Sequence, residues 1–337
     1  MARQKTKATI RQGWQTFHAF VSKRWSWVAS ASIVLILVLL LAWLIQTGRL
    51  DAGLAEYTPP TPATQRAKTL WDWINLLLIP LVLAATAVLL SKEANRRQRE
   101  AEQRRTHSQR EIEIDRWRQS VLQACLDFLG ELLLKEGLRA SEPEAEVREV
   151  ARAQVLTALR QLDGKRRGIL LQFLYESGLI EKGDPFVDLA TASLQEAYLP
   201  MAVLNRAELR GVNLRGANLQ GAHLNHADLR GANLIEADQS VANLERANLH
   251  EADLRRANLR GADLRQVNLF VAILRGTNLE GANLAGADLR RAHFFDANLA
   301  GANLEAANLG WAKVAADQLA QAKSLHGAIL PDGRQQE

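Results

Sequence analysis

The sequence predicts a stacked β-solenoid in its C-terminal half, preceded by two transmembrane α-helices and a small α-helical module. Three observations lead to this fold class. A large apolar residue recurs at nearly every fifth position from Leu189 to Val314. Two largely apolar stretches, residues 28–45 and 70–90, come earlier in the chain. Between these stretches and the repeat, apolar residues recur with the period of an amphipathic helix.

The five-residue period fits neither a regular helix nor a plain strand, so each unit must return the chain to one environment. In units such as Ala217-Asn218-Leu219, extended backbone points Ala and Leu to one side and the amide to the other. Glycine is frequent two positions after the leucine, where the chain has to bend. One unit cannot bury its leucine alone, so the roughly 26 units are expected to stack on one another.

These units resemble the pentapeptide repeat family, whose consensus of Ala-Asp/Asn-Leu-X-X is matched almost continuously from Leu189 to Leu309. The resemblance implies a right-handed quadrilateral β-helix with four units per coil, in which residues twenty apart lie above one another. The order of motifs along the chain is similar to that of membrane-anchored members common in cyanobacteria. A plasma or thylakoid membrane is then implied, if the chain is cyanobacterial.

The two apolar stretches are each near the ~20 residues that a helix needs to cross a bilayer. Tryptophans flank them, among them Trp27, Trp43 and Trp71, as expected at membrane interfaces. Basic residues precede the first stretch and follow the second, which predicts an integral membrane protein with both termini cytoplasmic. A signal peptide is the less favoured interpretation of the first stretch. Pro80 is expected to kink the second span.

The segments around the spans form the first half of the predicted domain order. Residues 1–27 form a basic N-terminal segment, in which Ile10, Trp14, Phe17 and Val21 share one stripe of an interfacial helix. A basic tail without that helix is the alternative. Residues 28–91 form the transmembrane hairpin, and residues 92–116 form a charged helical stalk. The stalk either holds anionic lipid headgroups or is simply solvated.

An α-helical module is predicted over residues 117–180. Ser141-Glu142-Pro143-Glu144 resembles a capping box that opens its second helix, and Gly164 is expected to end that helix. A third helix is expected over 165–176, with Gly178 at its stop. The module should cover the first coil of the solenoid at 187–315. Residues 316–337 are the C-terminal cap and tail, with a short helix over 317–322 and residues 325–330 folding back.

The sequence contains no recognised catalytic motif, no cofactor-binding motif and no metal-ligand set, so an enzyme is not expected. Cys125 is the only cysteine and lies in an apolar helical setting, which favours a packed thiol over a nucleophile. His223, His226 and His250 occupy outward positions on different sides, which favours solvated histidines over a metal site. Gln239 stands in a leucine position, where a backbone hydrogen bond or a local bulge is expected.

Some pentapeptide repeat proteins mimic duplex DNA with a strongly acidic rod and protect a topoisomerase, but this rod lacks that charge. Stacking instead puts Arg210, Arg230 and Arg290 in one outward column and Arg215, Arg255 and Arg275 in the next. This basic ridge argues against mimicry of DNA, and no nucleic acid partner is expected.

The best candidate for a binding site is a group of aromatic, apolar and arginine side chains near the last coils. Its members are Phe270, Ile273, Arg290, Arg291, Phe295 and Trp311, with Val271 beside them. The group either binds an unidentified protein partner or is covered by the helical module or the C-terminal tail. The predicted function is a membrane-anchored scaffold or adaptor that presents a cytoplasmic β-solenoid for protein–protein interaction. The alternative is a regulatory or assembly subunit of a membrane complex that acts through its transmembrane helices, and a homo-oligomer stays open.

Overall fold

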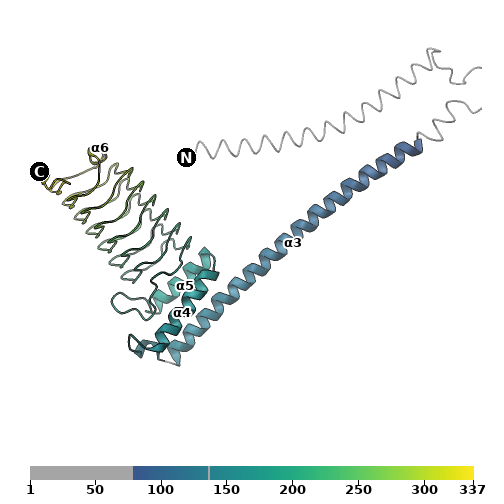
Figure 1. Ribbon diagram of the computed structural model, residues 1–337, viewed down its shortest axis with the longest axis horizontal. Helices are drawn as coiled ribbons and strands as arrows, with labels where there is room; N and C mark the ends of the chain where they lie inside the picture. Colours follow the sequence, from purple (N-terminus) through teal and green to yellow (C-terminus); the bar gives the residue numbers. More distant parts are fainter. Residues whose placement is uncertain (1–78, 136) are drawn as a thin grey trace, which may run out of the picture. The chain divides into compact units, whose positions relative to one another are not determined.

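The computed structural model describes residues 79–135 and 137–337 (Figure 1). The chain divides into two compact units, Met1–Arg105 and Thr106–Glu337. The described helices are α3 (Ile79–Leu134), the 3-10 helix η2 (Leu138–Ala140), α4 (Glu146–Gln161), α5 (Gly164–Glu176) and α6 (Ala316–Leu319). Short parallel bridges between α5 and α6 make up the solenoid.

Helix α3 is 56 residues long and changes character along its length. Its first turns are apolar and exposed, as at Leu81, Leu83 and Leu90. The following turns are charged and carry ion pairs four residues apart, such as Arg96–Glu100 at 3.0 Å. Helix thus continues from the end of the second apolar stretch through the segment expected to be a charged stalk.

The predicted membrane-spanning residues lie mostly outside the described part of the chain. Residues 1–27 and 28–45 fall there, and the stretch at 70–90 is described only from Ile79 onward. Across residues 79–135 and 137–337, no helix has an apolar run of the length that a bilayer requires. The turn preceding Pro80 is also outside the described residues, so the kink there stays a prediction.

The helical module is built from the end of α3 together with α4 and α5, which share one buried core. Leu122, Cys125 and Leu129 of α3 are buried with Leu159 of α4 and Leu170 of α5. Helix α5 ends beside Gly178, whose φ of 68° is the left-handed value typical of a helix stop.

The predicted capping box at residues 141–144 is wrong. Helix α4 begins only at Glu146, and its N-cap residue, Ala145, has no side-chain acceptor. Ser141 is engaged elsewhere, because its Oγ donates to the carbonyl of Leu138 at 2.5 Å and accepts from Nε of Arg148 at 3.1 Å. The arginine, seven residues later, captures the hydroxyl that a capping box would have used.

Gly164 does not end α4 but begins α5, which corrects the second prediction for this module. Helix α4 stops at Gln161, and Asp163 caps α5 by accepting from the amide of Arg166 at 3.1 Å. Gly164 and Gly168 lie one turn apart on the face of α5 that meets the first coil. A Cβ atom at Gly164 would overlap the carbonyl oxygen of Glu196, and one at Gly168 would overlap that of Tyr198. The two glycines let the helix backbone rest directly on the solenoid.

The solenoid has the register that the repeat predicted. Parallel bridges join residues twenty apart, from Ser193↔Asn213 to His293↔Lys313, so four five-residue units make one coil. The leucines and the alanines two positions before them are buried along the whole stack. Residues two positions after each leucine have positive φ, including residues other than glycine, such as Val241 and Val271. Apolar side chains therefore fill the tube, and every unit ends in a left-handed bend.

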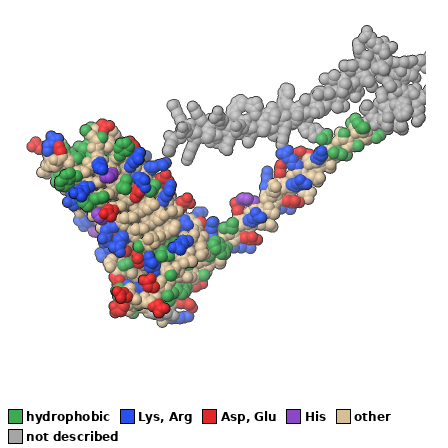
Figure 2. Space-filling model, viewed as in Figure 1, with side chains coloured by type: hydrophobic (Ala, Val, Ile, Leu, Met, Phe, Trp, Pro, Cys, Tyr) green, Lys and Arg blue, Asp and Glu red, His purple; other side chains and the backbone are tan. Residues whose placement is uncertain are grey.

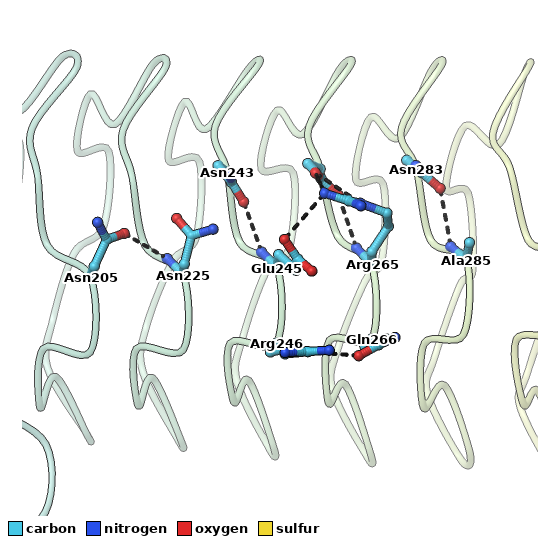
Figure 3. Close-up of polar contacts among 10 residues, drawn as sticks. Asn205, Asn225, Asn243, Glu245, Arg246, Arg265, Gln266, Asn283 and Ala285 are labelled. Atoms are coloured by element: carbon cyan, nitrogen blue, oxygen red, sulfur yellow. Dashed lines mark hydrogen bonds and ion pairs between the residues drawn. The ribbon is translucent and has the colours of Figure 1, made fainter.

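The outward Asn and Asp residues have a structural role that the sequence analysis did not assign. Their side-chain oxygens accept a hydrogen bond from the backbone amide two residues later, as Asn243 does from Glu245 at 3.0 Å and Asn283 from Ala285 at 3.2 Å (Figure 3). This arrangement is an Asx turn, which fixes the corner that follows each buried leucine. Other side chains pair between coils, as Arg246 does with Gln266 at 2.7 Å.

The helical module contacts the first coils of the solenoid. Arg152 of α4 donates to the carbonyl of Asp188, and Arg167 of α5 donates to that of Gln195. The segment after α5 adds one antiparallel bridge, Glu181↔Ala207. The expectation that the module covers the first coil is confirmed by these contacts.

At the other end, the tail extends the stack instead of folding back over residues 325–330. Helix α6 is shorter than the helix expected at 317–322 and is inserted between coils. After it, two further parallel bridges form, Asn303↔Ser324 and Asn308↔Ile329. The chain reverses only after these bridges, where Ile329↔Gln335 is antiparallel. The inserted helix shifts the register by one residue, which is why the five-residue rhythm breaks without the coil ending.

Gln239 is fully buried in its leucine position, and the backbone around it keeps the regular register. Its backbone amide donates to the backbone carbonyl of Asn258 at 2.8 Å, the same bond to the next coil that the leucines at the other buried positions make. The side-chain Nε2 and Oε1 atoms have no hydrogen-bond partner among the described residues. The prediction that the side chain of Gln239 bonds to the backbone, or that a bulge forms at this position, is therefore wrong.

Candidate functional site

The six candidate residues are referred to here as the aromatic–arginine patch: Phe270, Ile273, Arg290, Arg291, Phe295 and Trp311. The coil register places them along one side of the solenoid. Ile273 lies in the outward column between Asp253 and His293. The other members flank this column, Phe295 at one corner and the remaining four at the other.

Phe270 is held in a stack with its neighbours one coil away on each side. The His250 ring lies 5.4 Å from the Phe270 ring with an interplanar angle of 10°. On the other side, the guanidinium carbon of Arg290 is 5.3 Å from the ring centroid. Stacking of this kind stabilises the coil surface by itself. Phe270 is thus a half-buried support of the patch, and its ring faces are already occupied.

Phe295 and Trp311 are the open members of the patch. Phe295 is 61% exposed and Trp311 is 73% exposed, so within the described residues neither the helical module nor the C-terminal tail covers them. The guanidinium of Arg275 lies 5.1 Å from the Phe295 ring centroid and covers part of one face. Large exposed aromatic rings next to arginine are the usual anchors of protein interfaces.

Ile273 and Val271 are placed at a cost to the solenoid. In the column of Ile273, Asn233 and Asp253 accept hydrogen bonds from the corner amides, which an isoleucine side chain cannot do. In the column of Val271, Gly211 and Gly231 take the left-handed conformation that a β-branched residue strongly disfavours. Val241 takes the same conformation in another column, so of these two residues only Ile273 departs from the pattern of the repeat.

The arginines of the solenoid are less free than the sequence predicted. Arg265 and Arg290 each form an ion pair with the aspartate two residues earlier, Asp263 at 2.6 Å and Asp288 at 2.7 Å. The hydrogen bond from Arg265 lowers the pKa of Asp263 below its usual value, so this carboxylate stays charged at neutral pH. Figure 2 shows acidic side chains interspersed with basic ones on the solenoid face in view. In the predicted basic ridge, Arg230, Arg255 and Arg290 are each paired with the aspartate two residues earlier, so the ridge is partly neutralised.

Two contacts of the patch were missed by the sequence analysis, namely His250 on Phe270 and Arg275 on Phe295. The signal was present, because each pair is separated by twenty residues. The coil register of twenty residues thus aligns each ring with its stacking partner as well as arginines with each other.

The histidines of the solenoid stand in different columns. His223 stands in the column of Val203 and Asn243, whereas His250 stacks on Phe270. Over the described part of the chain, no three His, Cys, Asp or Glu side chains are grouped as metal ligands. Cys125 is buried in the helical module, and this burial raises the pKa of its thiol to about 11. The thiol is therefore protonated at neutral pH and packs as an apolar group.

Comparison with known proteins supports the repeat. The family model described as pentapeptide repeats matches eight copies, over residues 188–225, 213–238, 242–269 and 272–310. No curated protein matches the chain.

Three solved structures illustrate the similarity. The pentapeptide repeat protein Rfr23 from the cyanobacterium Cyanothece 51142 is 42% identical over 26% of this chain and 56% of its own, with a TM-score of 0.22. HetL, a pentapeptide repeat protein involved in heterocyst differentiation regulation in Nostoc sp. strain PCC 7120, is 31% identical over 44% of this chain and 86% of its own, with a TM-score of 0.16. QnrB1, a plasmid-mediated fluoroquinolone resistance protein, is 18% identical over 42% of this chain and 68% of its own, with a TM-score of 0.29.

Proposed function

We propose, because the chain belongs to the pentapeptide repeat family, that it is a scaffold which binds a protein partner on the outside of its solenoid and performs no chemistry. The interior of the tube is filled by alanine and leucine side chains. Recognition must therefore take place on the outer surface, where the side chains differ from coil to coil. The aromatic–arginine patch is the proposed binding surface.

The exposure of Phe295 and Trp311 carries this proposal. Large rings on the surface of a soluble domain lose solvent-exposed apolar area when a partner covers them, and aromatic residues of this kind dominate measured binding energies. Arg275, whose guanidinium lies 5.1 Å from the Phe295 ring centroid, adds a charged group beside this ring.

The test replaces both open rings in the full-length chain, as Phe295→Ser with Trp311→Ser. Affinity purification after gentle detergent solubilisation, with quantitative mass spectrometry, should recover fewer partner proteins with this variant than with the parent. We expect at least a tenfold loss, while the thermal unfolding midpoint changes by less than about 2 °C.

A matched control uses exposed apolar residues elsewhere on the solenoid. Met201 and Val241 stand in one column at a different corner and are 67% and 62% exposed. Replacing both with serine should leave partner recovery unchanged. Equal recovery by the patch variant and the parent would show that the patch is not the binding surface.

We further propose that the chain is anchored in a membrane by residues 28–45 and 70–90, with both termini in the cytoplasm. The described end of the second stretch supports this proposal, because Leu81, Leu83 and Leu90 are exposed on a helix that then becomes charged. The full-length chain should stay in the membrane pellet after an alkaline carbonate wash. Release of the chain into the supernatant by this wash would argue against the anchor. A reporter enzyme that is active only in the cytoplasm should be active when it is fused to either terminus.

A second candidate function is a regulatory or assembly subunit that contacts a membrane complex through its helices. The exposed apolar turns at the start of α3 favour it. Substituting Leu83 and Leu89 with alanine removes apolar volume there and leaves the solenoid unchanged. If this variant loses the partner while the Phe295 and Trp311 variant keeps it, the helices make the contact and the solenoid is a spacer.

A further inference from the structure

A shallow groove of about 510 Å³ runs along the corner of the solenoid that carries Phe295. Arg215, Arg255 and Arg275 line it from one column, and Arg256 lines it from the adjacent column. Ile235, half-buried, stands in the first column between Arg215 and Arg255. The groove therefore combines several cationic groups with an apolar residue on an exposed surface.

The cationic groups outnumber the carboxylates that face them. Glu236 is shared by two arginines, with Arg215 at 3.4 Å and Arg256 at 3.2 Å. Arg275 is 4.0 Å from Asp296, at the limit of an ion pair. Arg255 is the exception, because its guanidinium is paired with Asp253, Nη2 to Oδ2 at 2.7 Å. Each guanidinium has five N–H donors, so the weaker pairs of Arg215, Arg256 and Arg275 leave most of their donors for a ligand. Ion pairs as long and exposed as these contribute little, and an incoming carboxylate can replace or join them.

The spacing of the arginines fits an extended peptide. Arg215 and Arg255 are two coils apart, and Arg275 is one coil further. At a strand spacing of about 4.8 Å, the row is roughly 14 Å long. An extended chain advances about 3.3 Å per residue, so about five residues cover the row, and alternate side chains point toward it.

The groove is continuous with the aromatic–arginine patch through one pair of residues. Arg275 lies in the groove and also covers the ring of Phe295 at 5.1 Å. This contact restricts the arginine side chain before any ligand arrives, which lowers the entropic cost of binding. A peptide in the groove would place its next residues against Phe295.

We propose that this groove binds an extended, carboxylate-rich segment of the protein partner. Carboxylates on alternate residues pair with Arg215 and Arg275, while Arg255, already held by Asp253, lies between them, and an apolar residue at one end packs on Phe295. The inference rests on the proposed function and adds the chemistry of the partner. Ile235 in the groove and the ring of Phe295 beside it offer apolar contacts to side chains that lie between the carboxylates, which favours a peptide over a nucleic acid strand.

The experiment titrates the full-length chain in detergent with a fluorescein-labelled peptide that alternates Glu and Leu over about seven residues. Fluorescence anisotropy should show saturable binding that weakens with added salt. A matched peptide with Gln in place of Glu should bind at least tenfold more weakly. A labelled single-stranded DNA of about ten nucleotides serves as the competing polyanion.

The variant Arg215→Gln with Arg275→Gln should weaken binding of the Glu peptide about tenfold. Its control is Arg206→Gln with Arg246→Gln, since both of these arginines lie at another corner of the solenoid, outside the groove. The control should bind the peptide as the parent does, and circular dichroism should show that all proteins keep the same melting curve. Equal binding of the Glu and Gln peptides, or equal loss in both variants, would overturn the proposal.

Tighter binding of the DNA strand that depends on Arg215 and Arg275 would also overturn it, because the groove would then be a nucleic acid site. The failure of this inference is distinguishable from failure of the proposed function. If the Glu peptide does not bind but partner recovery still depends on Phe295 and Trp311, the patch binds its partner without the groove. If partner recovery is also independent of those rings, the proposed function is wrong as well.

Discussion

The two ends of the solenoid differ in what covers the outermost coil of the stack. At the end next to α5, the chain covers the first coil with its own helices, and backbone meets backbone at Gly164 and Gly168. At the end with α6, a four-residue helix and one further coil extend the stack, and Phe295 and Trp311 stay exposed on its side. The first coil is thus covered by helices, whereas the last coil is continued by further bridges of the tail.

This difference shows what the sequence outside the repeat contributes. The alanine and leucine positions are the same at both ends, so they do not distinguish the sealed coils from the open ones. The distinction comes from the segments that flank the repeat and from the variable corner residues. Function in such a fold is expected at positions where the repeat is not followed, and Ile273, in a column of outward Asn and Asp residues, is one of them.

The largest expected effect comes from breaking the sealed end with Gly168→Ala. A Cβ at this position overlaps the carbonyl oxygen of Tyr198, and the backbone on both sides has little room to move. We expect a loss of roughly 3 kcal/mol in the free energy of unfolding. Urea denaturation followed by circular dichroism measures it.

The control for this variant is Gly130→Ala, since Gly130 lies within helix α3 and a Cβ there meets no atom within 4 Å. This change should raise stability slightly, because alanine is the better helix former. A Gly168→Ala protein as stable as the parent would mean that α5 does not rest on the first coil as closely as described.

The next effect is expected at Arg148, which joins α4 to the segment that leads into the solenoid. Its side chain is 7% exposed and pairs with Asp184 at 2.8 Å, while its guanidinium lies 4.4 Å from the Phe186 ring. Arg148→Met keeps the apolar stem and removes the charge-assisted hydrogen bonds, at a cost of about 2 kcal/mol. Lys135→Met, which removes an exposed pair with Glu131, should cost less than about 0.5 kcal/mol in the same denaturation experiment.

The sequence predicted the repeat region in detail because the period itself carries the geometry. Once residues twenty apart are stacked, the buried positions and the outward columns follow, and the bridges confirm them. The candidate patch was found in the same way, from apolar residues at outward positions. Its exposure could not be predicted, because the stacking of Phe270 and the path of the tail depend on contacts made in three dimensions.

The helical module was predicted less well, for reasons that individual residues make clear. Ser141 matched a capping signal, but Arg148, distant by two turns, competes for its hydroxyl. Gly164 matched a helix stop, but the position needs glycine because the first coil presses on it. In both cases the residue type is explained by a contact with a distant part of the chain and not by the local helix-capping signal.

The coils between the two ends provide a third test, at Gln239. This side chain is buried in the tube without a hydrogen-bond partner among the described residues, between Leu219 and Leu259 in the stack. Gln239→Leu removes an unpaired amide from an apolar site and should raise the free energy of unfolding by about 1 to 2 kcal/mol. Gln220→Leu, on the exposed surface, should give no comparable gain. A less stable Gln239→Leu protein would show that the amide has a partner, such as a buried water.

The smallest expected effect depends on pH and is confined to the sealed end, at Glu208. Burial raises the pKa of this carboxyl, and the nearby charge of Asp228 raises it further. A carboxyl whose pKa is raised by folding favours the folded state at low pH, and that contribution is lost as the pH rises through its folded pKa. Glu208→Gln, which stays neutral, should therefore be more stable than the parent near pH 7 and similar to it near pH 4. The difference should stay below about 1 kcal/mol because the side chain is partly solvated. Melting curves of both proteins across this range measure it, and a constant difference would mean that Glu208 ionises as freely in the folded chain as in the unfolded one.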